Sequence, residues 1–241
     1  MQMNGCLVVY MHRLPAIVLL FFIVSPSTAN AGERDDTSVA TFNWEGAATQ
    51  SLYFLGIEHA QRLTQEKTRN ELKGPFFPDW KDSVAGLHGW SDGGSFFTNY
   101  IAHSMQGGVA GFIQIQNDAH GRSVEFSGSR KYWNSRMRAF GWAAIYSTQF
   151  ELGPISEATI GNVGKKPGTA GYVDLVITPA GGLGMIVLED VLDKYLLKKL
   201  EQGTAGIGKR RLYRVLFNPQ RSLANFLRGK APWYRDSRPI S

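Results

Sequence analysis

Three ionisable residues stand out because each lies in a stretch that is otherwise apolar and uncharged. His103 belongs to "NYIAHSMQGGVAGF", within the range 93–117, which contains no Lys, Arg, Asp or Glu. Glu151 ends an apolar helical pattern, and Asp174 is the only charged residue in "GYVDLVITP". Because a buried carboxylate is costly unless it is paired, Glu151 and Asp174 each need a donor. We predict that His103 meets both.

A histidine beside two carboxylates has more than one use. It is a general acid/base centre or half of a weak metal site, or it is a hydrogen-bonded clamp that fixes the register of the helices. The sequence leaves these alternatives open. Polar residues one helical turn away complete the expected group as binding residues, because residues four apart share a helix face: Asn99, Ser147 and Thr178.

Familiar catalytic and cofactor motifs are missing. The sequence has no His-x-x-x-His pair, no Gly-x-Ser-x-Gly turn and no glycine-rich phosphate loop followed by Lys. Its only cysteine, Cys6, precedes an apolar N-terminal segment and is expected to leave with it, which excludes a thiol nucleophile and cysteine-ligated metal from the mature chain. We therefore expect no resident metal and no cofactor.

The N-terminus has the pattern of a secretory signal peptide. The apolar segment "LPAIVLLFFIV" follows His12-Arg13, and Ala29-Asn30-Ala31 fits the small residues of a cleavage site. We expect a signal peptide over 1–31 and a mature chain that begins at Gly32 in the periplasm or at the membrane of the cell envelope.

Helical periodicity dominates the rest of the chain. No run alternates in the way that a half-buried strand does. The fold class predicted is all-α, a single-domain helical bundle. We expect a flexible leader over 32–43, the bundle over 44–202 and a basic tail with one short helix over 203–241. Predicted helices cover 44–72, 92–117, 131–152, 172–202 and 219–229.

Small residues recur inside these predicted helices, as in Gly107-x-x-x-Gly111 and in Gly181, Gly182 and Gly184. An interior glycine costs about 1 kcal/mol relative to alanine, so this many glycines indicate helices that approach closely. Such patterns are common in membrane bundles, and the range 93–117 is long enough to span a bilayer. Its polar residues favour a buried core helix instead.

Basic residues gather at the C-terminus. The range 203–241 holds nine Lys and Arg residues and one acidic residue, Asp236. In an exported protein such a tail favours anionic lipid or cell-wall polymer as a partner over nucleic acid. The alternative is a solvated, partly disordered end. The expected contact residues are Lys209, Arg210, Arg211, Arg214 and Trp233.

The order of three segments resembles that of VanZ-like and related bacterial envelope proteins. The segments are "SDGGSFFTNYIAHSMQGG", "YSTQFELGPISEATIGN" and "GYVDLVITPAGGLG", over about residues 90–190. A family of uncharacterised envelope proteins is closer, with an Asn-Tyr-x-x-His-Pro start and an Asp-Leu-x-x-Thr-Pro-x-Gly-Gly end. The residues that match are Asn99, His103, Gly107, Glu151, Asp174, Thr178, Pro179 and Gly182.

This resemblance has departures. Ser104 stands where the closer family has Pro, Thr178 stands where the VanZ-like pattern has Asn, and the several spanning helices of VanZ-like proteins are not evident. The resemblance implies a helical envelope protein and supplies no reaction.

Three functions follow from the sequence. The first is a non-enzymatic envelope protein that associates with membrane or cell wall through its basic tail. The second is a hydrolase that acts on an envelope lipid or glycan, with His103 as acid/base and Glu151 and Asp174 orienting it. The third is an integral helical membrane protein. Oligomeric state is not indicated.

Overall fold

The computed structural model describes residues 42–72, 74–160 and 171–240. No strand occurs in these ranges, and one isolated bridge joins Phe42 to Asp118. The predicted all-α fold is confirmed. The predicted signal peptide and nearly all of the predicted leader lie outside the described residues. The helices are α2 (Trp44–Leu63), α3 (Glu66–Glu71), α4 (Phe76–Ala85), η2 (Phe97–Ala102), α5 (His103–Asn117), α6 (Arg130–Leu152), α7 (Glu157–Ile160), α8 (Val173–Leu192), η3 (Asp193–Leu197), α9 (Lys198–Gln202), α10 (Ile207–Phe217) and α11 (Pro219–Leu227).

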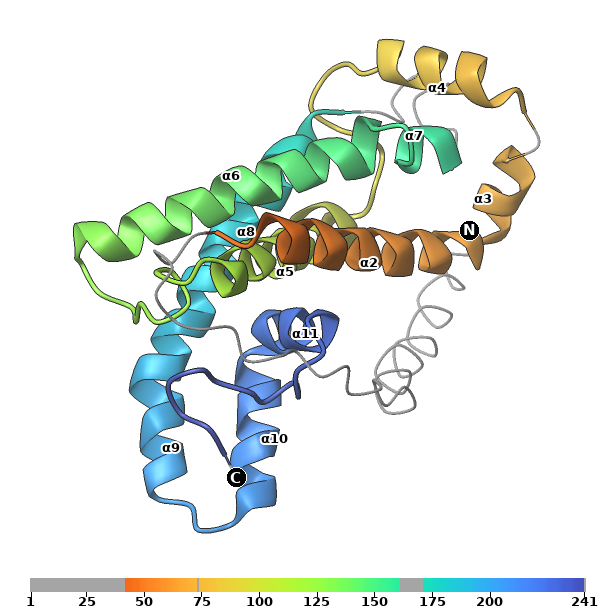
Figure 1. The fold of residues 1–241 in the computed structure, drawn as a ribbon. Coiled ribbons are helices and arrows are strands. Elements are labelled where there is room, and N and C mark those ends of the chain that lie inside the picture. Colours follow the sequence, from red (N-terminus) through yellow and green to blue (C-terminus); the bar gives the residue numbers. More distant parts are fainter. Residues whose placement is uncertain (1–41, 73, 161–170, 241) are drawn as a thin grey trace, which may run out of the picture. The chain divides into compact units, whose positions relative to one another are not determined.

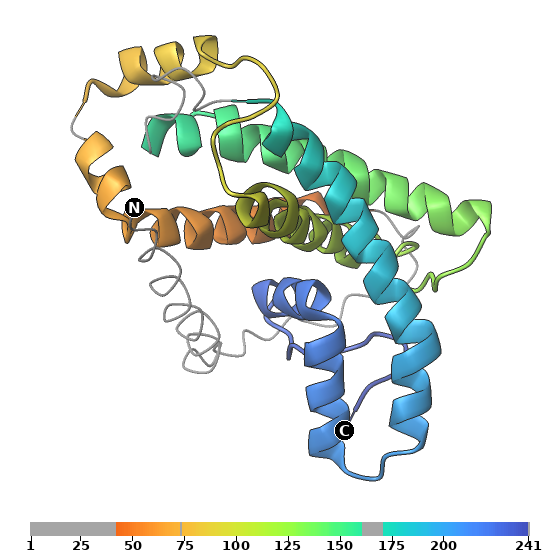
Figure 2. The same ribbon diagram turned by 180° about the vertical axis from the view of Figure 1, so that it is seen from behind.

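Helix α5 is surrounded by other helices. It packs against α2, α6, α8 and α11, and in Figures 1 and 2 it lies between α2 and α8. All of its residues from Gln106 to Asn117 are buried. This explains why the range 93–117 carries no charge: the middle of the range has no face toward solvent. The prediction that this segment is a core helix is confirmed for α5.

The approach of α5 to α8 depends on glycines. A Cβ on Gly182 would lie 2.5 Å from the carbonyl carbon of Gly107, and a Cβ on Gly107 would overlap the carbonyl oxygen of Thr178. The two backbones therefore touch, which side chains at these positions would prevent. Further along, Gly111 lies against Ile186. The two helices thus run in the same direction, and the contact fixes their register.

Some predicted helix boundaries are wrong. The first predicted helix breaks at Thr64-Gln65, and α3 follows as a separate helix. The predicted helix 92–117 begins later, at Phe97. Pro179 lies inside α8 and does not interrupt it.

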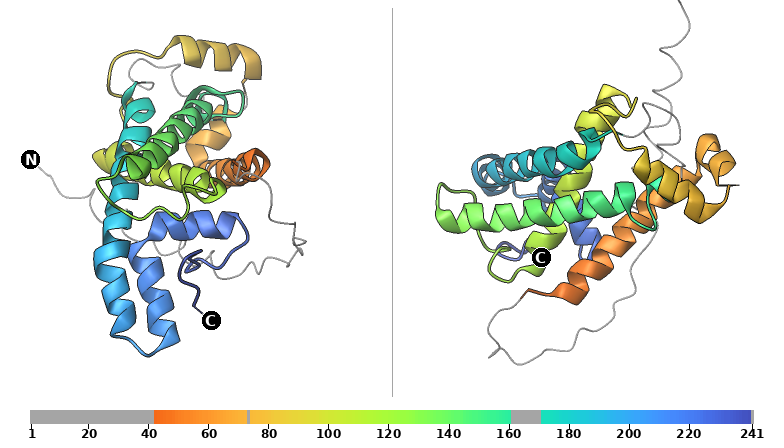
Figure 3. Two further views of the ribbon diagram at one scale, coloured as in Figure 1. Left: turned by 60° about the vertical axis from the view of Figure 1, so that its left-hand side comes forward. Right: turned by 90° about the horizontal axis from the view of Figure 1, so that it is seen from above.

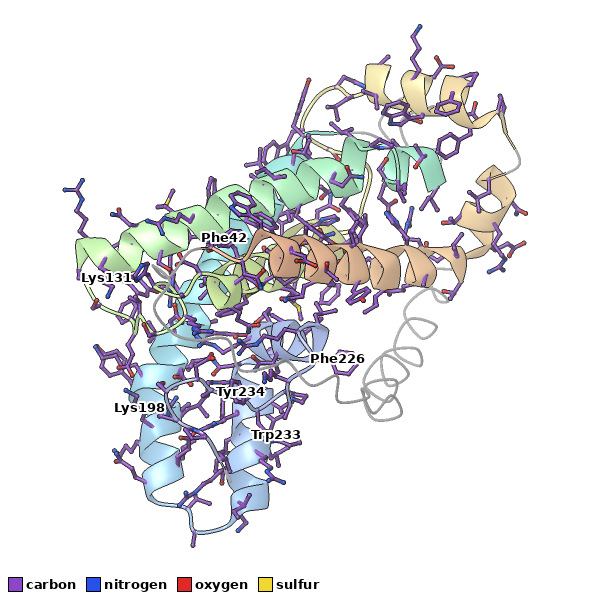
Figure 4. All side chains as sticks on the ribbon, viewed as in Figure 1. Phe42, Lys131, Lys198, Phe226, Trp233 and Tyr234 are labelled. Carbon is purple, nitrogen blue, oxygen red and sulfur yellow. The ribbon has the colours of Figure 1, made fainter. Side chains whose placement is uncertain are left out.

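The C-terminal range is more ordered than predicted. Helix α10 was not predicted, and it runs beside α9 (Figure 3). Trp233 and Tyr234 lie near α10 and α11 (Figure 4), where Arg211 stacks on Trp233 and Arg228 stacks on Tyr234. The range 203–240 is therefore a folded part of the bundle.

Arg214 was expected to contact an anionic partner, and its position in the structure does not allow this. Arg214 is only 1% exposed, because its guanidinium binds both carboxylate oxygens of Glu201 at 2.6 and 3.0 Å and donates to the carbonyls of Trp233 and Arg238. It cannot reach an external surface. Lys209 is exposed, whereas Arg210 and Arg211 are half-buried.

One helix in the described residues is long and apolar enough to cross a membrane by length and composition alone. It is the continuous range Val173–Gln202, formed by α8, η3 and α9, and a third of its most apolar window is buried inside the protein. Core helices of soluble proteins pass the same test.

We expect Gly182→Ala to lower the free energy of unfolding by about 1–3 kcal/mol, because its methyl group would force α8 away from α5. Gly184→Ala, two residues further along the same helix, is the matched control. A Cβ there meets nothing within 4 Å, so this change should raise stability by up to about 1 kcal/mol. Urea unfolding measures both, and equal effects would contradict the backbone contact.

Candidate functional site

His103, Glu151 and Asp174 come together from three helices. His103 is the first residue of α5, Glu151 lies in the last turn of α6 and Asp174 lies in the first turn of α8. The ring Nε2 of His103 is 3.5 Å from Oδ1 of Asp174, and its Nδ1 is 3.8 Å from Oε1 of Glu151. One ligand atom from each residue lies within 4.8 Å of the other two. The structure therefore joins the three residues singled out by the sequence.

Local backbone geometry places each of them at a helix end. His103 follows η2, a π-helical turn, and such turns shift the register of the residues that follow. Glu151 is placed by the end of α6 at Gly153, before Pro154. Asp174 is held next to the loop 89–94, because the backbone N–H of Val173 donates to the carbonyl of Trp90 at 3.0 Å.

The three residues line a cavity of about 590 Å³. Its walls come from α2, α4, the loop 92–94, η2, the start of α5, α6, α7 and the start of α8. The acidic residues of the lining are Glu58, Asp92, Glu151, Glu157 and Asp174. Its large apolar residues are Leu87, Phe97, Phe150, Leu152 and Leu175.

A hydrogen-bond chain from α2 orients the His103 ring. Oε2 of Glu58 accepts from the hydroxyl of Tyr146 at 2.6 Å and from the amide nitrogen of Gln106 at 3.1 Å. Because the Gln106 nitrogen faces Glu58, its Oε1 faces Nδ1 of His103, at 3.0 Å. Nδ1 must then be the protonated nitrogen. Nε2 keeps its lone pair and faces Asp174.

Asp174 also has a supporting partner. It shares a hydrogen bond with Asp92, whose Oδ1 accepts from the amide of Asn99 at 2.5 Å and from the N–H of Gly94 at 2.9 Å. Those two bonds lower the pKa of Asp92, although burial acts in the opposite direction. Asp92 is therefore the ionised acceptor of this pair.

Electrostatics at the site disfavour charge. Burial, followed by the negative charge of Asp92, raises the pKa of Asp174 to about 8. Burial, followed by the charges of Glu157 and Asp174, raises the pKa of Glu151 well above its ordinary value. Burial lowers the pKa of His103. In the absence of a bound cation, these shifts favour the neutral forms of all three residues, and Asp174 and His103 are mostly neutral near pH 7.

The three residues expected to bind a ligand contact the site residues or their partners, and they do not line the cavity. Ser147 and Thr178 are fully buried; the hydroxyl of Ser147 donates to the backbone carbonyl of Asp174 at 3.2 Å, and Thr178 Oγ1 is 3.2 Å from His103 Nδ1. Asn99 is 4% exposed and holds Asp92. These contacts position the site residues, and none of these three residues lines the cavity.

Two acidic residues of the site were missed. Glu58 lies in a charged half of α2, where a carboxylate is normally solvated, and Asp92 lies in the polar segment "SDGG" before the central helix. The signal available for Glu58 was its spacing, because it follows Phe54 and Leu55 on the buried side of α2. Asp92 had no comparable signal, since its role depends on the loop 92–94.

No protein-family model matches this sequence, and no curated protein and no solved structure is significantly similar to it. The resemblance to VanZ-like envelope proteins stays a prediction.

The buried Glu58 generates a prediction about pH. Burial raises its pKa from 4.5 to about 8, so folding takes up a proton between these values. The stability that this proton contributes is complete below pH 4.5 and is lost as pH rises toward 8. Glu58→Gln, which mimics the protonated form, should match the wild type near pH 5 and exceed it in stability near pH 8.5.

Urea unfolding at several pH values, with a chelator present, measures this difference. Glu45→Gln, in the exposed first turn of the same helix, is the control, and its stability should stay parallel to that of the wild type. A constant difference between Glu58→Gln and wild type across this range would show that Glu58 is ionised in the folded protein.

Proposed function

We propose that this protein is a hydrolase whose active site is the group His103, Glu151 and Asp174. The observation that carries the proposal is their convergence on a cavity large enough for a substrate, with Oε1 of Glu151 and Oδ1 of Asp174 forming no hydrogen bond. Perturbed ionisable groups that face a cavity are typical of catalytic sites.

The alternative, in which His103, Glu151 and Asp174 form a hydrogen-bonded clamp that only fixes the register of the helices, has less support. A polar clamp is needed where packing leaves the register of two helices undetermined. Here the backbone contact of Gly107 with Thr178 and Gly182 already fixes the register of α5 and α8. One oxygen of each acidic residue, Oε1 of Glu151 and Oδ1 of Asp174, also lacks the hydrogen-bond donor that a structural clamp would supply.

The chemistry assigned to the site is attack of water on an ester. A water molecule between Nε2 of His103 and the two free carboxylate oxygens is held for attack on the substrate carbonyl or phosphorus. The oxygen of water forms the new bond, and the bond to the alcohol breaks. Nε2 of His103 takes the proton of water and passes it to the leaving oxygen. Apolar side chains of the lining, such as Phe97 and Leu175, favour a lipid over a glycan as substrate.

Mass spectrometry of products tests this proposal with a panel of ester and phosphoester lipids beside glycans. We expect hydrolysis of a lipid, and a loss of about 100-fold or more in His103→Ala. His120→Ala, at an exposed position, should keep full activity. Activity that survives in His103→Ala would contradict the assigned site. A glycan product that depends on His103 would keep the hydrolase and replace the substrate.

A second candidate function is attachment to an anionic membrane surface, favoured by the outer face of α10. Leu212 and Leu216 are 54% and 61% exposed, one helical turn apart, and exposed Lys209 lies on the same face. This pattern of exposed leucines beside a cation is typical of helices that lie on a lipid surface. It relocates the expected anionic contact from Arg214 to this face.

Vesicle flotation tests the attachment. The double variant Leu212→Ser, Leu216→Ser should bind vesicles that contain anionic lipid at least about fivefold more weakly, because two apolar side chains are lost from the contact. The control changes two equally exposed residues on α2, Leu52→Ser and Ile57→Ser, and should bind like the wild type. Equal binding by all three proteins would remove α10 from the interface.

A further inference from the structure

Acidic side chains outnumber basic ones among the described residues that line the cavity. Arg62 is the one Lys or Arg in this described lining, and Arg62 pairs with Glu157. Glu151 Oε1 and Asp174 Oδ1 are buried atoms without a hydrogen-bond partner. Carboxylate oxygens buried in this way hold a proton or a cation.

Distances within the group match those of a metal site. Two ligands at about 2.1 Å from a tetrahedral ion lie about 3.4 Å apart, and His103 Nε2 is 3.5 Å from Asp174 Oδ1. Oε1 of Glu151 lies 3.8 Å from the other ring nitrogen, Nδ1, and one ligand atom from each of the three residues lies within 4.8 Å of the other two, so a rotation of the Glu151 side chain toward Nε2 completes the set. Asp174, at 6% exposure, points its unpartnered oxygen at this position.

Two ligands also have supporting partners of the kind that metal ligands have. Nδ1 of His103 donates to Gln106, which Glu58 orients, so Nε2 is free for an ion. Asp174 is held by Asp92, and Asp92 is held by Asn99. In metal sites such outer partners fix the orientation of the ligands. A clamp built only for packing would not require a lone pair left free at Nε2.

We propose that His103 Nε2, Glu151 and Asp174 bind one divalent transition-metal ion. One imidazole and two carboxylates favour Zn²⁺ or Mn²⁺ over Mg²⁺ and Ca²⁺, because the latter two prefer oxygen ligands alone. Three protein ligands leave a coordination position open toward the cavity, as in catalytic zinc sites. This proposal departs from the expectation of no resident metal. Its role in activating water rests on the proposed hydrolase, whereas its binding does not.

Calorimetric titration of chelator-treated protein with Zn²⁺ and with Mn²⁺ tests the site. We expect one ion per chain, bound at least about 100-fold more weakly by Asp174→Asn and by His103→Ala. Gln106→Leu, which removes the acceptor at Nδ1 of His103 and leaves the three ligands in place, should weaken binding by about tenfold. The control Asp236→Asn, at an exposed carboxylate, should bind like the wild type. Circular dichroism confirms that each variant is folded, and Glu151→Gln replaces any variant that is not.

The outcomes separate the two proposals. Absence of binding of either ion, or equal binding by Asp174→Asn and wild type, overturns the metal site. If the protein binds neither ion and hydrolysis continues in the presence of chelator, the hydrolase proposal stands and the metal site is rejected. One bound ion that depends on Asp174, with no hydrolysis of any substrate in the panel, keeps the metal site and rejects the hydrolase.

Discussion

The backbone contact between α5 and α8 is the constraint on which the rest of the structure depends. Gly107 lies against Thr178 and Gly182, and Gly111 lies against Ile186. Since the helices run in the same direction, this contact places the residues one turn earlier side by side: His103 on α5 and Asp174 on α8. The site therefore forms as a consequence of core packing, and its geometry can be set before any ligand binds.

The candidate residues were predictable for a simple physical reason. A single charge in an apolar helix must find a partner, so His103, Glu151 and Asp174 were expected to meet from sequence alone. The same reasoning cannot find Glu58, because a carboxylate among other charged residues is normally solvated. Asp92 illustrates a second limit, since its role depends on a loop whose path is set by the packing of α8 on that loop.

The C-terminal arginines show why the net charge of the range 203–241 was a poor guide to its contacts. From the sequence alone, the range 203–241 was interpreted as a basic tail without ion-pair partners. Its partners lie on α8, η3 and α9, which precede it in the chain. Arg221 binds Asp190, Arg214 binds Glu201, and Arg238 binds both Asp193 and Glu201. The net charge of a segment does not show how many of its charges are unpaired, because buried ion pairs can join it to other segments of the chain.

A comparison of the two acidic regions gives the strongest argument for function. Asp190 is almost fully buried and receives Arg136 at 2.8 Å, Arg221 at 2.5 Å and the hydroxyl of Tyr132 at 2.9 Å. The fold thus supplies cations and donors where a buried carboxylate is structural. Near Oε1 of Glu151 and Oδ1 of Asp174, the described part of the chain supplies one neutral imidazole, and a lone pair of this imidazole faces Asp174. Proteins leave such groups incompletely paired mainly where a ligand completes them. This contrast argues that the acidic residues at the cavity bind a ligand, whereas the ion pairs around Asp190 hold the helices together.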